Sequence, residues 1–141
     1  MIGLASDHAG FELKEFVKSV LEKKGIAYKD FGTSSPTSVD YPDYAHRLAV
    51  ALQNEEVTSG IAVCGSGNGI AMTLNRHSGI RAALCWEEEI ARLARSHNDA
   101  NVLALPGRFI SKTNAERCVN AFLETLFESG RHRSRINKIE I

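Results

Sequence analysis

The sequence predicts an α/β fold, a single doubly wound (Rossmann-like) domain with a five-stranded parallel sheet and helices on both faces. Short apolar segments rich in β-branched residues alternate with longer segments whose apolar residues recur every three or four positions. The 141 residues are 43% hydrophobic, which supplies one core and would be crowded as two domains. We therefore expect one domain over residues 1–141 that ends in a basic tail, residues 130–141.

Five segments are predicted as strands because they are short, apolar and bounded by turn-forming residues. In chain order they are Ile2–Ser6, Ile26–Phe31, Gly60–Cys64, Ile80–Cys85 and Asn101–Leu105. Helices between successive strands predict parallel pairing, and in such sheets ligands bind beyond the carboxyl ends of the strands.

Two amphipathic helices are predicted in the first half of the chain. Phe11–Lys24 has apolar residues at helical spacing, and Lys14 belongs to its opposite, polar face. Gly25 ends this helix as its C′ residue. The second helix begins at Asp40 and tolerates Pro42 in its first turn.

Two more helices are predicted in the second half. Glu87–Arg95 begins with acids, which suit a helix N-terminus. A longer helix follows, in which Thr113 and Glu116 have the spacing of a capping box. It continues with Leu126 facing inward until Gly130 breaks it.

The central strand leads into a loop with three glycines in five positions, Gly65–Gly69. Glycines let backbone N–H groups approach a ligand, and a helix starting at Ile70 adds the positive end of its dipole. The loop therefore predicts an anion-binding cradle with the thiol of Cys64 at its rim. A thiolate near a helix start suits a nucleophile or base, although a free cysteine at a strand end is equally typical of a small packed hydrophobe.

Three familiar loop motifs do not match this cradle. A dinucleotide fingerprint needs a small residue where Ile70 stands. A serine nucleophile elbow needs glycines in place of Cys64 and Asn68, and a thiol phosphatase loop needs an arginine in place of Ile70. A backbone cradle beside a thiol is what remains.

The overall composition limits the partners and the compartment. Seventeen basic and seventeen acidic residues cancel, so no general attraction to nucleic acid or to a membrane surface is expected. We expect no signal peptide, and no apolar run approaches the ~20 residues of a membrane span. Three widely spaced cysteines favour free thiols in the cytoplasm. His8, Cys64 and His97 lack the spacing of structural zinc ligands, so no metal site is predicted.

Several polar residues follow strand ends or lie in neighbouring loops, and we expect them to converge on one crevice. They are Asp7, His8, Cys64–Gly69, His97 and Asn98. Arg131 and Arg135 are four residues apart, so on a helix they share a face and can clamp one anion, unless they only form a solvated tail. Four further histidines and cysteines, His46, His77, Cys85 and Cys118, are assigned to surface or packing roles.

Motifs along nearly the whole chain resemble one family. They are Asp7-His8-Ala9-Gly10-Phe11, Gly32-Thr33, Asp40-Tyr41-Pro42, Cys64-Gly65-Ser66-Gly67-Asn68-Gly69-Ile70, Asn75-Arg76, Gly79-Ile80-Arg81, residues 96–103 and Gly130-Arg131-His132. Together they are similar to the ribose-5-phosphate isomerase B family, which includes allose-6-phosphate and galactose-6-phosphate isomerases. The resemblance implies aldose–ketose isomerisation of a sugar phosphate, without a metal or an organic cofactor.

The resemblance also implies a role for each site residue. Cys64 would be the base that moves a proton between C1 and C2, and His97 would open the furanose ring. The loop residues Gly65, Gly67, Asn68 and Gly69 would hold the enediolate with Ser66 assisting, and the sugar site would be lined by Asp7, His8, Tyr41 and Asn98. The phosphate would bind to Arg108, Arg131 and Arg135.

The family resemblance further implies a homo-oligomer, a dimer with the site between its subunits and often a pair of dimers. Some members carry a glutamate at the position of Ile70 and lack the cysteine, so Ile70 favours Cys64 as base. The alternatives are isomerisation of a six-carbon sugar phosphate, a cysteine-nucleophile hydrolase or transferase, and a non-catalytic sugar-phosphate sensor.

Overall fold

The strands form one parallel sheet in the computed structural model, which describes residues 1–141. The sheet contains β1 (Ile2–Ser6), β2 (Tyr28–Asp30), β3 (Ser59–Cys64), β4 (Ala82–Leu84) and β5 (Val102–Pro106), in the order β2-β1-β3-β5-β4. The expected five-stranded parallel α/β sheet is confirmed. The outer strands β2 and β4 are shorter than the sequence indicated.

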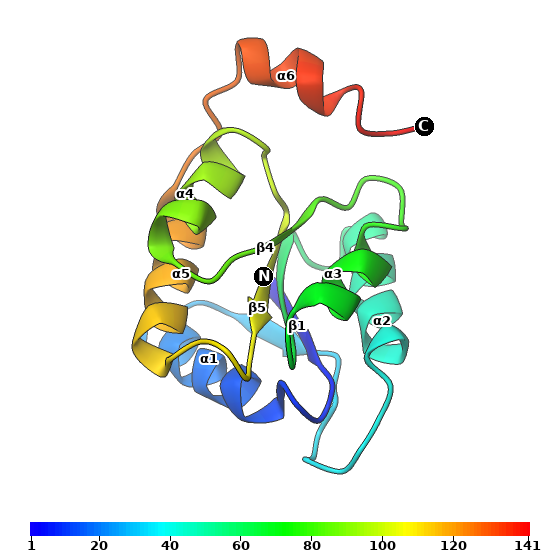
Figure 1. Cartoon of the computed structure of the whole chain (residues 1–141), viewed down its shortest axis with the longest axis vertical. Coiled ribbons are helices and arrows are strands. Elements are labelled where there is room, and N and C mark those ends of the chain that lie inside the picture. Colours follow the sequence, from blue (N-terminus) through cyan, green and yellow to red (C-terminus); the bar gives the residue numbers. More distant parts are fainter.

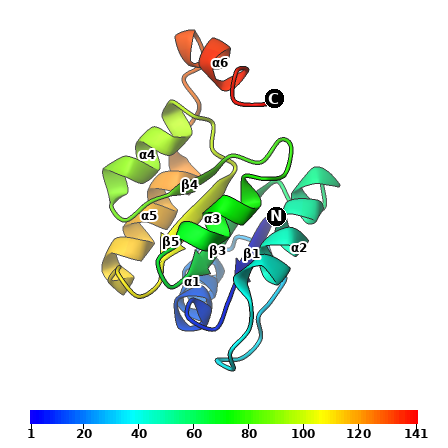
Figure 2. The ribbon, with the colours of Figure 1, turned by 45° about the vertical axis from the view of Figure 1, so that its right-hand side comes forward.

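Helices cover both faces of the sheet. They are α1 (Phe11–Lys23), α2 (Tyr41–Gln53), α3 (Asn68–Leu74), α4 (Glu88–Ser96), α5 (Lys112–Glu124) and α6 (Arg131–Ile136). Figures 1 and 2 show α1, α4 and α5 on one side of the sheet and α2 and α3 on the other.

Side-chain size differs between the two faces of the sheet. Leucine, isoleucine and valine side chains such as Leu4, Ile61 and Leu103 face α1, α4 and α5. The α2 and α3 side receives mostly small side chains, Ala5 and Ala62 among them. Because successive residues of a strand point to opposite faces, Cys64 also lies on the α2 and α3 side.

Lys14 is a correction to the sequence analysis, because it is buried rather than on the polar face of α1. Its ammonium contacts both carboxylate oxygens of Asp30 at 2.7 and 2.8 Å and donates to the carbonyl of Thr33. Burial lowers the pKa of Lys14. Although desolvation opposes it, hydrogen bonds from Lys14 and Lys18 lower the pKa of Asp30. This ion pair ties α1 to the end of β2.

The last long helix also differs from the prediction. Ser111, not Thr113, caps α5, because its hydroxyl accepts the N–H of Asn114 at 3.1 Å. The helix ends at Glu124, and Leu126 is exposed instead of facing inward. The predicted start of α2 at Asp40 and the left-handed Gly25 after α1 are confirmed.

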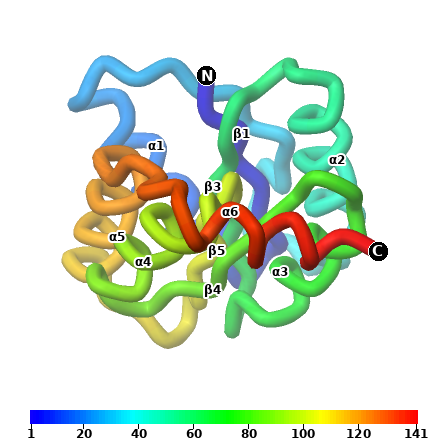
Figure 3. Tube along the Cα trace, turned by 90° about the horizontal axis from the view of Figure 1, so that it is seen from above, coloured from blue at the N-terminus to red at the C-terminus, as the bar shows by residue number.

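The basic tail folds into the short helix α6, which buries His132 and Ile136. Figure 3 shows α6 crossing the end of the molecule where the parallel strands begin. None of the helices is both long and apolar enough to cross a lipid bilayer.

Candidate active site

The first candidate residues lie in the turn between β1 and α1. The buried carboxylate of Asp7 accepts the backbone N–H of Gly10 at 3.0 Å. A Cβ on Gly10 would lie 2.3 Å from the carbonyl oxygen of Val63, so only glycine lets this turn approach β3. His8 follows Asp7, and its Nδ1 lies 3.2 Å from both the backbone N and the carbonyl oxygen of Val39. This contact with Val39 fixes the orientation of the imidazole ring.

The glycine loop is held from two sides. The N–H groups of Gly107 and Arg108 donate to the carbonyls of Cys64 and Gly65 at 2.8 and 2.9 Å. Gly67 has a left-handed φ of 79° and caps α3. The N–H groups of Gly65, Ser66 and Gly67 donate to no other backbone group. The loop therefore presents fixed and unpaired N–H donors, as an anion cradle requires.

Ser66 and Tyr41 flank this loop. The hydroxyl of Ser66 accepts the N–H of Asn68 at 3.3 Å. A Cβ on Gly69 would lie 2.4 Å from Cζ of Tyr41, so the phenol ring rests directly on Gly69. The first residue of α2 and the second residue of α3 thus form one wall of the cradle.

The three thiols have different surroundings. Cys64 is 4% exposed at the end of β3, beside the loop. Cys85 and Cys118 are fully buried in the core on the α1, α4 and α5 side. Burial raises the pKa of Cys85 to about 12 and that of Cys118 to about 11, so both remain thiols at neutral pH. These values agree with a packing role for Cys85 and Cys118.

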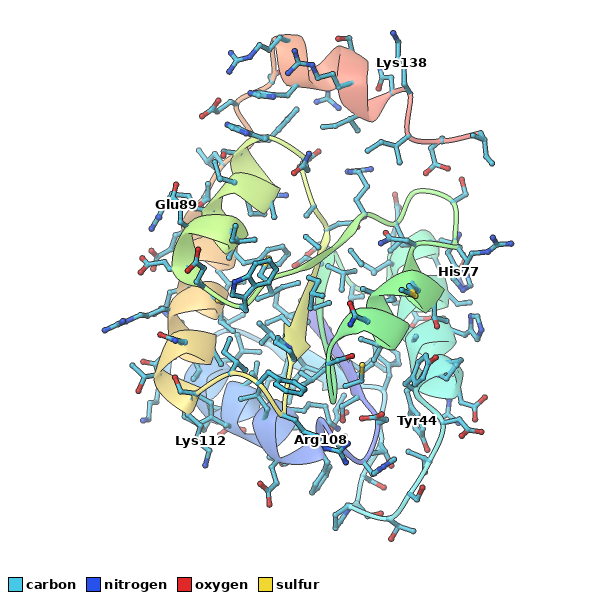
Figure 4. The ribbon with its side chains drawn as sticks, viewed as in Figure 1. Tyr44, His77, Glu89, Arg108, Lys112 and Lys138 are labelled. Atoms are coloured by element: carbon cyan, nitrogen blue, oxygen red, sulfur yellow. The ribbon has the colours of Figure 1, made fainter.

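A basic cavity of about 380 Å³ opens beside the loop. Its lining includes His8, Arg108 and Lys112, together with Glu12. Arg108 and Lys112 lie in the turn after β5 and at the start of α5, where Figure 4 shows them close to the same end of the molecule. The cavity has the size and charge to hold a phosphate group.

His97 and Asn98 do not join this cluster within one chain, and the expectation of a single crevice is wrong at this point. His97 ends α4, which runs back from the carboxyl end of β4 to the start of β5. The backbone carbonyl of Asn98 accepts from Arg81, directly before β4. Both residues precede a strand, and in a parallel sheet that places them at the amino end.

Arg131 and Arg135 also lie at the amino end. They are exposed on α6, one helical turn apart, so the shared face predicted for them is present. Arg133 points away and lies over the ring of Phe127 at 4.9 Å. The expected site residues thus divide between the two ends of each chain: Asp7, His8, Tyr41, Cys64–Gly69 and Arg108 lie at the carboxyl end, and His97, Asn98, Arg131 and Arg135 at the amino end.

Comparison with known proteins identifies the family. A family model described as Ribose/Galactose Isomerase matches residues 2–139. The chain belongs to the ribose/galactose isomerase family. This confirms the resemblance and makes the chain an aldose–ketose isomerase.

Relatives in the ribose/galactose isomerase family match over almost their whole length. The ribose-5-phosphate isomerase B of Escherichia coli is 41% identical over 98% of this chain and 93% of its own. The solved structure of a ribose 5-phosphate isomerase from Thermotoga maritima is 53% identical, with a TM-score of 0.97 over 99% of this chain and 96% of its own. The Mycoplasma genitalium isomerase B, solved with bound ribulose-5-phosphate, is 39% identical with a TM-score of 0.93 over 98% of this chain and 92% of its own.

One group of side chains has the composition of a metal site. Donor atoms of His97, Glu128 and His132 all lie within 4.8 Å of one another. The two imidazole rings are stacked, with centroids 4.3 Å apart and planes 15° from parallel. A metal ion would have to lie about 2.0–2.1 Å from a nitrogen of each ring, in the plane of both rings. The lone pairs of two stacked, nearly parallel imidazoles do not point to one such position. The stacked geometry is therefore unsuited to a metal.

Three further residues beside these sites, Lys112, Glu128 and His132, were not predicted from the sequence. Arg108 lies in the turn after β5 and Lys112 begins α5, so only the fold of this turn, and no helical spacing, brings both to the cavity. Glu128 and His132 are also four residues apart, but only the fold of the segment after α5 brings them to His97. No sequence spacing indicates that contact, because more than thirty residues separate His97 from His132.

Proposed function

We propose that this member of the ribose/galactose isomerase family interconverts ribose 5-phosphate and ribulose 5-phosphate through a cis-enediolate. We choose this substrate because the chain is similar to the Mycoplasma genitalium isomerase, whose structure contains bound ribulose-5-phosphate. The cradle and the basic cavity support it from this chain's own residues, because one suits an enediolate oxygen and the other a phosphate.

Cys64 is the base in this proposal. Its thiolate takes the proton from C2 of the open-chain aldose, and the electron pair moves onto the oxygen at C1. The thiol returns the proton to C1 while the hydroxyl proton on O2 moves to O1, assisted by Ser66, and C2 becomes the carbonyl. Each N–H donor aimed at the enediolate oxygen contributes about 3 kcal/mol in the transition state.

The substrate is held by the residues at the carboxyl end. Asp7, His8 and Tyr41 line the sugar beside Gly65, Gly67, Asn68 and Gly69. Arg108 binds the phosphate from the basic cavity, where Lys112 adds a second cation. No metal or organic cofactor is required for these steps.

We propose a homodimer in which a second copy supplies His97, Asn98, Arg131 and Arg135 to this end. When two copies pack about a two-fold axis, the carboxyl end of one copy can meet the amino end of the other. The symmetry then yields two complete sites. Exposed apolar side chains beside the cradle support such packing. Met72 on α3, Trp86 after β4 and Phe109 after β5 are 68%, 52% and 76% exposed. Pairing of dimers into a tetramer is a further outcome that a mass measurement resolves.

The small-molecule substrate and the cysteines support a cytoplasmic protein. All three thiols are free and buried, as in a reducing compartment. Nucleic acid and membranes have no part in the proposed function.

The first experiment is proton NMR of ribose 5-phosphate in D₂O with purified protein and a metal chelator. We expect ribulose 5-phosphate and solvent deuterium at C2 of the aldose. Allose 6-phosphate and galactose 6-phosphate are run in parallel, and faster turnover of either would replace the five-carbon substrate by a six-carbon one.

Two other outcomes would contradict the isomerase mechanism. Binding of the sugar phosphates with no ketose and no exchange would indicate a sensor. A substrate-derived mass increase on Cys64 would indicate a cysteine nucleophile.

A further inference from the structure

The end of α4 and the start of α6 meet through two stacked histidines. The rings of His97 and His132 lie 4.3 Å apart at 15° to one another. His132 is 5% exposed, and its Nε2 has no hydrogen-bond partner. His97 is half-exposed, so it presents its free edge and outer face to solvent while His132 supports its inner face.

A carboxylate lies beside both rings. Oε2 of Glu128 is 3.4 Å from Nε2 of His132 and 4.0 Å from Nε2 of His97. Its position is set by the backbone, because the N–H of Glu128 donates to the carbonyl of Ser96 at 3.0 Å. Ser129 and Gly130 then take left-handed φ values of 66° and 62°, which turn the chain into α6 and bring His132 under His97.

We propose that His132 and Glu128 are positioning residues for ring opening by His97, an inference that rests on the proposed function. Opening the furanose removes the proton from the hydroxyl at C1, breaks the bond between C1 and the ring oxygen, and delivers a proton to that oxygen. His97 carries the proton and is briefly an imidazolium. The face of His132 holds the plane of the His97 ring, and the carboxylate of Glu128 stabilises the positive charge on His97.

This role separates the two halves of the reaction chemically. Ribose 5-phosphate is a furanose and must be opened before its C2 proton can be removed. Ribulose 5-phosphate cannot form a furanose because its C5 oxygen carries the phosphate, so exchange of its C1 proton with solvent needs no ring opening. Loss of a residue that acts through His97 should therefore slow the turnover of ribose 5-phosphate and leave the exchange rate of ribulose 5-phosphate unchanged.

The experiment measures both processes by NMR in D₂O on the full-length protein. His132→Ala should lower kcat for ribose 5-phosphate by roughly tenfold to a hundredfold, because misplacing a catalytic group costs rates of this order. Deuterium exchange into C1 of ribulose 5-phosphate should stay within about threefold of the unsubstituted protein. His132→Phe keeps a stacked ring and should recover most of the lost turnover. Ser134→Ala, on the same helix and exposed, is the matched control and should change neither rate.

Glu128→Gln tests the carboxylate without disturbing a buried site, since Glu128 is more than half exposed. It should lower turnover of ribose 5-phosphate several-fold and leave exchange unchanged. Equal losses of turnover and exchange in the His132 variants would overturn the proposal in favour of a structural role, and so would unchanged turnover in His132→Ala. Absence of turnover and exchange in the unsubstituted protein would instead refute the proposed function.

Discussion

The backbone N–H of Arg108 donates to the carbonyl of Gly65 over 2.9 Å, so the turn after β5 holds the glycine loop after β3. One residue thereby fixes the cradle with its main chain and lines the basic cavity with its side chain. The distance between the proposed enediolate donors and the proposed phosphate site is therefore set by a single turn. We therefore expect changes in the loop to affect chemistry and substrate binding together.

Replacing Cys64 tests the base. Cys64→Ala should lower both turnover of ribose 5-phosphate and exchange of ribulose 5-phosphate by about a hundredfold or more, as loss of a proton-transfer group does. Cys118→Ala is the matched control, because it removes an equally buried thiol that stays protonated. It should reduce thermal stability and leave kcat intact. Retention of most activity in Cys64→Ala would show that another group is the base.

Substitutions at two glycines test whether the contact between Gly69 and Tyr41 matters for activity. Gly69→Ala places a Cβ 2.4 Å from Cζ of Tyr41, so the ring must move, and we expect kcat/KM to fall roughly tenfold. At Gly79 a Cβ meets nothing within 4 Å, although φ is 79°. Gly79→Ala should therefore cost about 1 kcal/mol of stability with unchanged kinetics. Similar kinetic losses in both variants would exclude a specific role for the Tyr41 contact.

Mixing two inactive variants tests the shared site. In a hybrid dimer of Cys64→Ala and His97→Ala subunits, one of the two sites has both residues intact. Random reassociation makes half of the dimers hybrid, so about a quarter of the original activity should return. Subunits are exchanged by mild denaturation and refolding, and activity is followed against each variant alone. If the mixture stays as inactive as its components, the two ends do not form one site.

Removing Lys14 tests the buried ion pair. Lys14→Met keeps a long side chain but leaves Asp30 and the carbonyl of Thr33 without their buried partner. Chemical denaturation should show a loss of about 3 kcal/mol. Lys18→Met, at the more exposed partner of the same carboxylate, should cost less than about 1 kcal/mol. Equal costs would mean that burial of Lys14 contributes nothing to the pair.

The pair His46 and His77 should make stability depend on pH. Their Nδ1 and Nε2 atoms lie 2.7 Å apart, and burial together with His46 lowers the pKa of His77 below 6.5. The unfolded chain therefore binds a proton at His77 more readily than the folded chain does, and protonation favours unfolding. The stability that neutral His77 contributes is complete above about pH 6.5 and is lost as the pH falls below it. Urea unfolding at about pH 7.5 and pH 5.5 should show less pH dependence in His77→Gln than in the unsubstituted protein. An unchanged dependence would contradict the pairing.

Hydrophobic periodicity was sufficient to predict the five strands and the helices between them, because each element buries one face in a common core. It failed where burial depends on distant residues. Lys14 has the spacing of a surface lysine and is buried only because Asp30 at the end of β2 and Thr33 in the following loop contact it. Leu126 has the spacing of a core residue, but α5 ends at Glu124 and leaves it exposed.

The site was predicted best where residues are close in sequence. The glycine loop follows from Gly65–Gly69 alone, and its unpaired N–H groups agree with the expected cradle. His97 was placed at the wrong end because it was grouped with residues that follow strands, whereas it precedes β5. The pairing of ends between two copies has no signature in local sequence, and it remains a proposal.

The two outermost strands of the sheet, β2 and β4, have only three residues each. Such short edges offer few free backbone groups to a neighbouring strand, which protects the sheet from extension into another molecule. The proposed self-association is thereby directed away from the sheet edges and toward loops and helix ends. In this protein those loops and helix ends carry the polar residues of the two proposed half-sites.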